Sequence, residues 1–405
     1  MDAVASRSSR AIVDSGELSG TTVLALNSGS SSLKFGLYNV AGRQTRMVLE
    51  GEAETSGDGA HLMSAINATQ ETLLSESLSS CRPADVMQRL GRLIVDQRLP
   101  RPMAVGHRVV HGGPTLRQPI LIDEAVLQLL AQASDFAPLH IPAALALIRL
   151  TRRHFPGLPQ VACFDTGFHA GMPPVARVLP LARTLQDEGI QRYGFHGLSC
   201  ESVLHQLGDE IPERMIIAHL GNGASITAVK HGGSIDTSMG LTPTGGIIMG
   251  TRSGDLDPGV LVYLLRKKQL DAGALEALVD REAGLLGISG LSGDMRKLHD
   301  AAATNTDVQL AIDMFTCSAR KQMAAMIAVL DGVDLIVFTG GIGEHDAEIR
   351  RAVVKGLDWM GINLDAASNE AHKNPISDPS SRCKVLVLPS REDEQIARHT
   401  AHLVN

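Results

Sequence analysis

Short apolar runs that end in polar, glycine-containing turns recur along the chain and dominate its pattern. The first run covers residues 23–26 and leads into a turn of amide, glycine and hydroxyl side chains at 27–32. Apolar and polar residues then alternate from Leu33 to Tyr38. A short apolar run is typical of a buried strand, and alternation with a period of two is typical of a strand with one buried face. The pattern therefore predicts a strand, a turn and a second strand.

The turn between these two strands could bind an anion. It is longer than the two residues that a simple hairpin requires, and its backbone N–H groups and hydroxyls are potential hydrogen-bond donors. Lys34 follows closely enough to add a positive charge. An ordinary serine-rich hairpin explains this stretch, taken alone, equally well.

A second segment repeats this design in the other half of the chain. An apolar strand over 215–220 leads into a turn that contains Gly221, Asn222 and Gly223, and an alternating strand leaves it and continues to Val229. Self-similarity of this kind indicates an internal duplication. We therefore expect two related halves that face one cleft.

Other predicted strands end in residues that can carry chemistry. Strands over 103–106 and 160–164 precede Arg108 and Asp165, respectively. α/β proteins present ligand-binding groups at the carboxyl ends of their strands. Functional roles are therefore expected for both residues, although an arginine at a strand end can also be purely structural.

Two histidines and two further strands complete the set of candidate features. His140 lies in a turn bracketed by prolines, and His196 lies between glycines in a segment that concentrates aromatic residues. A strand over 335–338 opens into glycines before a helix that begins at Ala347, and a last strand over 385–388 precedes a group of carboxylates. A single histidine is more often structural than catalytic, so His140 by itself does not indicate a catalytic site.

The remaining pattern predicts helices and long loops. The expected helices cover residues 70–97, 123–133, 143–151, 260–268, 272–279, 307–330 and a terminal segment that ends at 403. Residues 50–59 are expected to form a turn or a strand edge. The segments 236–259 and 287–296 are expected to be ligand-binding loops, because long irregular loops in compact domains are usually functional or disordered and the first of them has too many apolar residues for disorder.

Length, charge and cysteine usage limit the class of protein. A chain of 405 residues is too long for one small core, so two domains are expected. The net charge of −7 argues against a nucleic-acid-binding protein. Five scattered cysteines without CxxC spacing favour a reduced, cytoplasmic protein, and the sequence has no apolar run of membrane-spanning length. Residues 1–20 are expected to be a flexible extension rather than a targeting segment.

Seven motifs, in order from about residue 22 to the C-terminus, identify the family that the chain resembles. They are NSGSSSLK at 27–34, GHRVVHGG at 106–113, FDT at 164–166, RYGFHG at 192–197, HLGNG at 219–223, GTRSGD at 250–255 and GIGE at 341–344. The chain resembles the acetate kinases, of the acetate, propionate and butyrate kinase group within the sugar-kinase, Hsp70 and actin superfamily.

The resemblance implies a fold, a reaction and partners. The fold would be α/β, with two duplicated actin-like (ribonuclease H-like) domains whose mixed sheets are flanked by helices, and with the active site in the cleft between them. Residues 21–167 together with 393–405 would form the N-terminal domain, and 168–392 the C-terminal, nucleotide-binding domain. The reaction would be the reversible transfer of the γ-phosphoryl group of ATP to acetate, with ADP as the product and Mg²⁺ or Mn²⁺ as the metal. A homodimer is usual in the family.

The resemblance also assigns roles to individual residues by motif position. Catalytic positions are matched by Asp165, Arg108, Arg252 and His196, and positions that support the transition state by His140, His196 and His219. Substrate-binding positions are matched by Arg108, Val110, Leu139, Phe195 and Pro243. Nucleotide-binding positions are matched by Lys34, His219, Leu220, Gly221, Asn222, Gly223, Asp294, Met295, Arg296, Gly341, Ile342, Gly343, Glu344 and His345. Metal-binding positions are matched by Asn27 and Glu392, with Asp393 and Glu394 as alternatives to Glu392.

The chain departs from the family pattern at three places. Ile141 follows His140 where asparagine is usual, and His345 also stands where asparagine is usual. The last strand is followed by Ser-Arg-Glu-Asp-Glu at 390–394 where Thr-Asn-Glu-Glu is usual. The first two departures concern the fine geometry of the nucleotide and acyl sites and not the class of reaction.

The implied chemistry suits these residue types. Phosphoryl transfer depends on alignment and on charge around the transferring group, which two arginines, a histidine and a metal ion can supply. A carboxylate acceptor is already a nucleophile, so Asp165 is expected to orient groups or hold metal-bound water rather than abstract a proton. Val110 leaves less room than alanine would, so acetate is expected over propionate.

Three other functions are compatible with parts of the pattern. A propionate or butyrate kinase of the same family would have a larger acyl pocket. An ATP-dependent scaffold such as actin or Hsp70 would use the same cleft without a small acceptor. A metallohydrolase is the weakest alternative, because the 15 histidines include no HExxH spacing.

Overall fold

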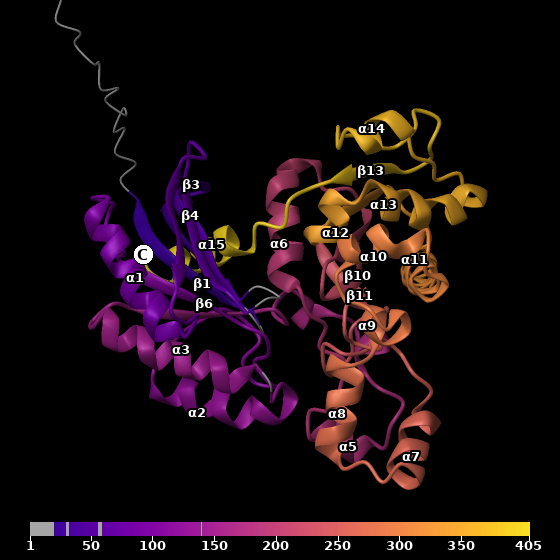
Figure 1. The fold of residues 1–405 in the computed structure, drawn as a ribbon, viewed down its shortest axis with the longest axis horizontal. Coiled ribbons are helices and arrows are strands. Elements are labelled where there is room, and N and C mark those ends of the chain that lie inside the picture. Colours follow the sequence, from indigo (N-terminus) through magenta and orange to yellow (C-terminus); the bar gives the residue numbers. More distant parts are fainter. Residues whose placement is uncertain (1–19, 30–31, 56–58, 139) are drawn as a thin grey trace, which may run out of the picture.

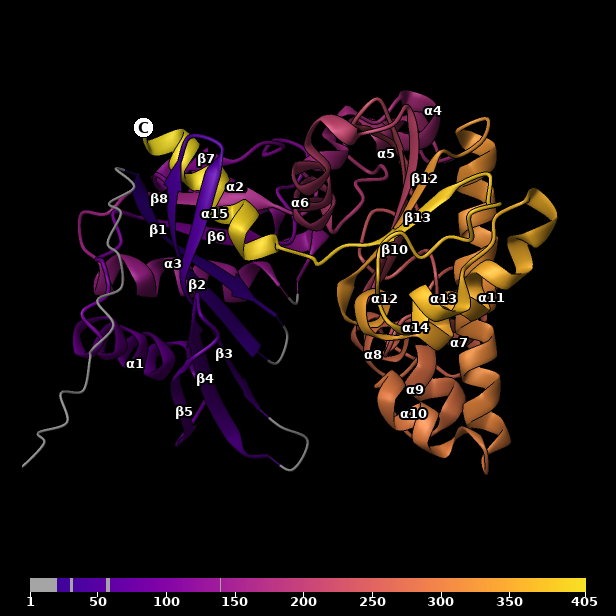
Figure 2. The same cartoon turned by 90° about the horizontal axis from the view of Figure 1, so that it is seen from above.

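The computed structural model describes residues 20–29, 32–55, 59–138 and 140–405, and contains two mixed β-sheets flanked by helices (Figures 1 and 2). The expected N-terminal extension lies outside these residues except for Gly20, and Leu139 lies outside them as well. The fold class expected from the resemblance is confirmed. Within the described residues, no helix combines the length and the apolar character that crossing a membrane requires.

The first sheet has eight strands in the order β5-β4-β3-β2-β1-β6-β8-β7. Its strands are β1 (Thr21–Ser28), β2 (Ser32–Ala41), β3 (Gln44–Thr55), β4 (His61–Asn67), β5 (Thr72–Leu78), β6 (Ala104–Val109), β7 (Ile120–Leu121) and β8 (Gln160–Phe164). The second sheet has five strands in the order β11-β10-β9-β12-β13. Its strands are β9 (Arg214–Leu220), β10 (Ala224–Lys230), β11 (Gly233–Thr237), β12 (Leu335–Thr339) and β13 (Lys384–Val387).

The two sheets share one topology at their centres. In the first, β3, β2 and β1 pair antiparallel, and β1, β6 and β8 pair parallel. In the second, β11, β10 and β9 pair antiparallel, and β9, β12 and β13 pair parallel. The strand-turn-strand unit that repeats in the sequence is the antiparallel pair β1–β2 in one sheet and β9–β10 in the other. The internal duplication is therefore also present in the fold.

Fifteen α-helices surround the sheets in the described part of the chain. They are α1 (Pro83–Asp96), α2 (Glu124–Gln132), α3 (Ile141–His154), α4 (Pro174–Arg177), α5 (Arg183–Asp187), α6 (Gly197–Leu207), α7 (Pro258–Lys267), α8 (Ala272–Arg281), α9 (Gly284–Ser289), α10 (Met295–Ala302), α11 (Thr306–Val329), α12 (Gly340–His345), α13 (Ala347–Val354), α14 (Ala366–Glu370) and α15 (Glu392–Val404).

Helices cover both faces of each sheet, which explains the unbroken apolar runs in β1 and β9. Leu24 and Leu26 of β1 pack in a cluster with residues of α1, whereas Val23 and Ala25 pack on the other face with residues of α15. A strand buried on both faces needs apolar residues at every position rather than at alternate ones. The C-terminal helix α15 thus belongs to the core of the first sheet, although it follows the last strand of the second (Figure 1).

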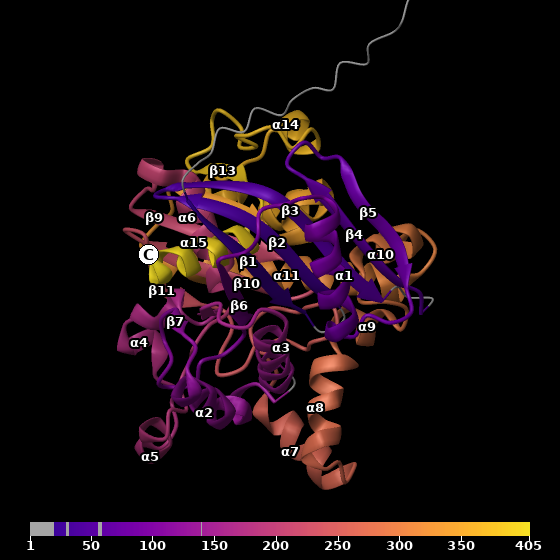
Figure 3. The same cartoon turned by 90° about the vertical axis from the view of Figure 1, so that its left-hand side faces the viewer.

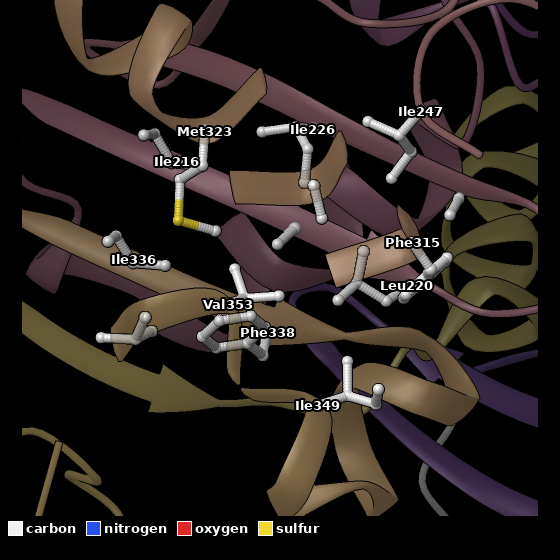
Figure 4. Close-up of a cluster of buried hydrophobic side chains, with 14 of the residues drawn as sticks. Ile216, Leu220, Ile226, Ile247, Phe315, Met323, Ile336, Phe338, Ile349 and Val353 are labelled. Atoms are coloured by element: carbon white, nitrogen blue, oxygen red, sulfur yellow. The ribbon is translucent and has the colours of Figure 1, made fainter. Parts of the chain in front are cut away.

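The second sheet packs against α11 in the same way. Figure 4 shows Ile216 and Leu220 of β9 and Ile336 of β12 in one cluster with Phe315 and Met323 of α11. On its opposite face, Met215 and Ile217 pack with residues of α6. Neighbouring residues of β9 therefore point to opposite faces, which leaves the ends of the strands as the places where polar side chains can gather.

Residues 70–97 do not form one helix, so this prediction is wrong in its first part. Thr72–Leu78 is the edge strand β5, which pairs antiparallel with β4, and only Pro83–Asp96 is helical. The leucines of this segment fit a helical pattern locally, but pairing with β4 buries Leu74 and satisfies the backbone. Pro83 then starts the helix, because proline is favoured in the first helical turn.

Residues 50–59 were expected to form a turn or a strand edge, but Gln44–Thr55 is an internal strand that pairs with β2 and with β4. The glycine that indicated a turn has a packing role. A Cβ atom at Gly51 would lie 2.5 Å from the ring of Phe35 and 2.4 Å from the carbonyl oxygen of Ser64. Glycine at this position lets the neighbouring strand and the core ring approach closely.

The glycines after β12 are also part of a helix rather than only a loop. The short helix α12 begins at Gly340, and α13 follows from Ala347 as expected. The other predicted helices are present with shifted ends. The division into domains at residues 167 and 393 remains a proposal, which the packing of α15 on the first sheet supports.

Candidate active site

A cleft of about 1970 Å³ brings nearly all the predicted site residues together. Its walls come from both sheets and from helices α10, α12 and α15; in Figure 3 the first sheet lies in front of the second. The predicted residues that line it are Asn27, Lys34, Arg108, Val110, His140, Asp165, Phe195, His196, His219, Gly221, Asn222, Gly223, Pro243, Arg252, Asp294, Met295, Arg296, Gly341, Ile342, Glu344, His345 and Glu392.

Two predicted nucleotide-binding residues lie beneath the cleft surface. The side chain of Leu220 is fully buried in the core of the second sheet. Gly343 is a buried residue of α12, and its carbonyl oxygen accepts a hydrogen bond from Arg350. Neither residue is among those that line the cleft.

Arg108 and Asp165 form a bidentate ion pair at the floor of the cleft. Arg108 is the next-to-last residue of β6, and Asp165 directly follows the parallel strand β8. The register places Arg108 beside Cys163, so both side chains lie at the same end of the sheet. Arg108 Nε donates to Asp165 Oδ1 over 2.9 Å, and Nη2 donates to Oδ2 over 2.6 Å. Burial opposes the charge of Arg108, but attraction by Asp165 and Glu392 outweighs burial and raises its pKa. Arg108 is therefore a fixed, permanently charged group.

Asn27 connects this ion pair to two carboxylates at the start of α15. Its Oδ1 accepts a hydrogen bond of 3.1 Å from Arg108 Nη1. Its Nδ2 donates to Glu392 Oε2 over 3.1 Å and to Asp393 Oδ1 over 2.9 Å. The amide thus holds the two carboxylates side by side, although they lie at the opposite end of the chain.

The two carboxylates differ in their electrostatic surroundings. Burial raises the pKa of Asp393, assisted by the charge of Glu392, to about 6. Burial also disfavours ionisation of Glu392, but attraction by Arg108 outweighs it and lowers the pKa of that carboxyl. Carboxylate oxygens are the ligands that Mg²⁺ prefers, and phosphate-handling sites use one or two of them together with substrate phosphates. Glu392 and Asp393 therefore fit a magnesium site.

The rings of His196 and His219 stack on each other in the part of the cleft wall that adjoins the second sheet. Their ring centroids lie 4.1 Å apart, with an angle of 19° between the planes. Ser225 Oγ lies 3.0 Å from His196 Nδ1, and Ser199 Oγ lies 2.8 Å from His219 Nδ1. Burial lowers the pKa of both imidazoles, and in His196 the neighbouring His219 and Arg108 lower it further. Both rings are therefore neutral at physiological pH, with each Nδ1 held by a serine.

Arg252 differs from Arg108 because, among the described residues, no carboxylate forms an ion pair with its guanidinium. Its Nη1 donates to the carbonyl oxygen of Pro243 over 3.2 Å, and no ion pair involves it within the described residues. Burial lowers its pKa, and Arg108 lowers it further against the attraction of Asp280. A half-buried guanidinium without a carboxylate partner can bind an anionic substrate without first breaking an ion pair.

Arg252 and His196 both approach Gly223, in the turn after β9. A Cβ atom built on Gly223 would lie 3.1 Å from His196 Nε2 and 3.3 Å from Arg252 Nη1. Burial lowers the pKa of His140 to about 4, and the charges of Arg252 and Arg108 act in the same direction. Arg252, His196 and the backbone of the turn after β9 can therefore contact one anion, and neutral His140 lines the same cleft.

An apolar wall borders this polar centre. Val110 and Phe195 are buried, and Phe195 belongs to an aromatic cluster in which its ring centroid lies 5.6 Å from that of His111. Pro243 lines the cleft beside Arg252. These residues form a rigid apolar surface next to the cationic groups, which suits a small molecule with one charged and one apolar end.

The predicted nucleotide-binding residues of α10 and α12 form a further part of the cleft wall. Asp294 caps α10 through the backbone N–H of Arg296, and the two side chains pair over 2.8 Å. The side chains of Arg296 and His345 are 90% and 80% exposed. These two long side chains are thus free to contact a bound ligand.

Sequence reasoning missed the polar residues that hold the site in place. Ser199, Ser225 and Ser390 are isolated serines in the sequence, and no motif distinguishes them from surface serines. Asp393 was considered only as an alternative to Glu392.

The chain is similar to known proteins over almost its whole length. Residues 22–398 match the acetokinase family. The acetate kinase of Methylocella silvestris is 40% identical over 400 residues, which cover 95% of this chain and 98% of the relative. The acetate kinase of Acetivibrio thermocellus is 39% identical over 396 residues, which cover 94% and 99%.

Two solved structures have a similar fold. A propionate kinase from Francisella tularensis superposes with a TM-score of 0.86 at 35% identity, covering 95% of this chain and 100% of that one. The acetate kinase of Porphyromonas gingivalis superposes with a TM-score of 0.82 at 34% identity, covering 95% and 100%.

Proposed function

The chain belongs to the acetokinase family, and we propose that it transfers the γ-phosphoryl group of ATP to acetate, reversibly, giving acetyl phosphate and ADP. The enzyme is thus a phosphotransferase with a carboxyl group as acceptor. The observation that carries this proposal is the convergence of Arg252, His196 and the turn at Gly223 beside an apolar wall. An anionic headgroup and a methyl group can be bound there at the same time.

The chain's own side chains would supply most of the charge around the transferring group. Arg252 would bind and neutralise the phosphoryl oxygens directly, because its guanidinium has no carboxylate partner. Arg108, held by Asp165, would do so from the other side. His196 would donate a hydrogen bond through Nε2, since Nδ1 is held by Ser225. Phosphoryl transfer gains most from positioned charge of this kind.

Asp165 is proposed to act by orienting Arg108 rather than as a base. Both of its carboxylate oxygens accept hydrogen bonds from Arg108. The acceptor carboxylate needs no deprotonation, so the reaction places no demand on a general base. This geometry supports the orienting role among those expected from the sequence.

Glu392 and Asp393 would hold Mg²⁺ at the start of α15. Held by these two carboxylates, the ion would supply positive charge that offsets the negative charge of the ATP phosphates. Asn27 would contribute by holding the two carboxylates, because its amide oxygen already accepts a hydrogen bond from Arg108. Lys34, Arg296 and the backbone of the turn after β9 would bind the nucleotide.

A substrate series tests the proposed reaction. We expect ATP-dependent formation of an acyl phosphate, trapped by hydroxylamine, with kcat/KM for acetate at least about tenfold above that for propionate, since one methylene is worth roughly 1–3 kcal/mol in a tight pocket. Val110→Ala should reduce the preference for acetate over propionate, because the smaller side chain would enlarge the acyl pocket. Comparable kcat/KM values for acetate and butyrate would instead identify a kinase for longer acids, and ATP hydrolysis without hydroxamate would rule out an acyl acceptor.

We also propose that the enzyme is a cytoplasmic homodimer. All five cysteines are free thiols, which suits a reducing compartment. Helix α7 is rich in apolar residues but contributes no buried side chain within the described residues, and Val260, Val262 and Tyr263 are exposed. A contiguous apolar surface of this kind is typical of an interface.

The homodimer can be tested by sedimentation equilibrium at micromolar concentration. We expect a mass of two chains for the unmodified protein and of one chain for Tyr263→Lys, because a buried lysine would cost the interface several kcal/mol. Val95→Lys, at an exposed position on α1, is the control and should remain dimeric. A monomeric unmodified protein would contradict the proposal.

A further inference from the structure

Glu344 lines the cleft, but its carboxylate is engaged with the backbone of the protein. One oxygen, Oε1, accepts a hydrogen bond of 3.0 Å from the N–H of Gly340 and a second of 2.9 Å from the N–H of Ser390. Gly340 is the first residue of α12, whereas Ser390 lies in the connection between β13 and α15. A single oxygen atom thus joins two segments that are separated by 50 positions in the sequence numbering.

The first of these segments touches the histidine pair. Gly340 has a φ of +77°, and a Cβ atom there would lie 2.8 Å from the carbonyl oxygen of Leu220 and 3.1 Å from His219 Nε2. Glycine is therefore required at the start of α12, and movement of Gly340 toward His219 would create a steric clash. The carboxylate of Glu344 holds the Gly340 peptide in this position.

The second segment carries the two carboxylates that are proposed to bind the metal. Ser390 Oγ donates to Ser199 Oγ over 3.1 Å, and Ser199 in turn lies 2.8 Å from His219 Nδ1. The N–H of Arg391 donates to Ser202 Oγ over 3.2 Å. Glu392 follows directly, so the bond from Ser390 to Glu344 lies two residues from it.

The C-terminal end of α12 is held independently, which fixes where Glu344 can reach. Arg350 is fully buried, and its Nη1 donates to the carbonyl oxygens of Gly343 and Glu344, each over 2.9 Å. Its Nε donates to Asn369 Oδ1 over 2.8 Å. Because Arg350 anchors the backbone of α12, the carboxylate of Glu344 is held in a fixed position between Gly340 and Ser390.

We infer that Glu344 is a positioning residue that ties the start of α12, beside His219, to the connection that carries Glu392 and Asp393. It thereby fixes the position of α12, where the nucleotide is proposed to bind, relative to the two carboxylates that are proposed to bind the metal. This inference rests on the proposed function and gives Glu344 a role different from the nucleotide contact expected from the sequence. The role requires two good acceptor positions on one oxygen, and it does not require a negative charge.

The inference is tested by comparing a variant of Glu344 that loses the hydrogen-bond acceptor with one that loses only the negative charge. Glu344→Ala removes the acceptor, whereas Glu344→Gln keeps an amide oxygen that can accept both N–H groups. We expect Glu344→Ala to weaken binding of MgADP, measured by calorimetry, by about 10–100-fold, the usual effect of losing a residue that orients metal ligands. Glu344→Gln should restore most of the affinity, and KM for acetate should change little. Glu210→Ala, which removes an exposed carboxylate in the same lobe, is the control.

A second measurement does not depend on activity or on metal. Amide hydrogen exchange at Gly340 and Ser390 should accelerate in Glu344→Ala and remain slow in Glu344→Gln, with the core of β9 unchanged. Equal losses in the alanine and glutamine variants, or unchanged exchange at both amides in the alanine variant, would overturn the inference. An unmodified enzyme that forms no acyl phosphate would instead overturn the proposed function, and the exchange result would still decide the role of Glu344.

Discussion

Arg252→Ala is expected to lower kcat for acyl phosphate formation by about 10³-fold, the order of magnitude that arginines supplied to a transferring phosphoryl group provide. Arg252 is half-buried in the lining of the cleft, and no ion pair involves it within the described residues. Its charge is thus available in the transition state, where charge accumulates on the phosphoryl oxygens. KM for ATP should change much less than kcat, because the nucleotide has other partners.

The effect of Arg252 can be separated from a loss of structure. Its recorded polar contacts are with the carbonyl oxygen of Pro243 and the sulfur of Met249, so removal should leave the thermal midpoint nearly unchanged. Arg252→Lys should recover only part of the rate, because an ammonium group lacks the planar fork that matches phosphate oxygens. Arg82→Ala, in an exposed pair on α1, is the control and should keep full activity. Near-normal turnover of Arg252→Ala would show that this residue is not catalytic.

Asp165→Ala is expected to reduce both stability and activity, because it leaves Arg108 buried without its main partner. Removal of one member of a buried ion pair costs about 3–5 kcal/mol of unfolding free energy. The lower end of this range is expected here, since Glu392 and Asn27 remain near Arg108. Loss of the bidentate contact also frees the guanidinium to rotate, so kcat should fall together with stability.

A double-mutant cycle measures how strongly Arg108 and Asp165 stabilise each other. Asp165→Asn keeps the shape and one acceptor, so it should lose less stability than Asp165→Ala. Combining Arg108→Met with Asp165→Leu removes both charges, and the double variant should be more stable than either single one while remaining inactive. Urea unfolding measures these energies, with Asp85→Ala at an exposed pair as the control. Full stability of Asp165→Ala would contradict the role assigned to the ion pair.

The central strands could be predicted from the sequence because both faces of each sheet are covered. Residues 23–26 and 215–218 are apolar at every position, and the structure buries them between helices on both sides. The edge strand at 72–78 was mistaken for a helix, since its pairing with β4 leaves only a weak alternating pattern. Gly51 was read as a turn signal, but it serves the close packing of Phe35.

The site could be predicted in its residue types but not in its connections. Arg108 and Asp165 were expected at strand ends, and the parallel register of β6 and β8 explains why they meet. Ser199 and Ser225 could not be predicted, because their function depends on contacts with His219 and His196 that only the tertiary structure forms. The roles of individual residues remain predictions that the proposed variants test.

The sequence by itself determined the buried strands, their duplication and the chemical groups that follow them, because local patterns encode these features. Only the tertiary structure decided which groups are partners. It pairs Arg108 with Asp165 while leaving Arg252 without a carboxylate, and it directs Asn27 toward carboxylates of the last helix. These choices depend on sheet register and on the packing of α15 against β1, which bring together residues from opposite ends of the chain.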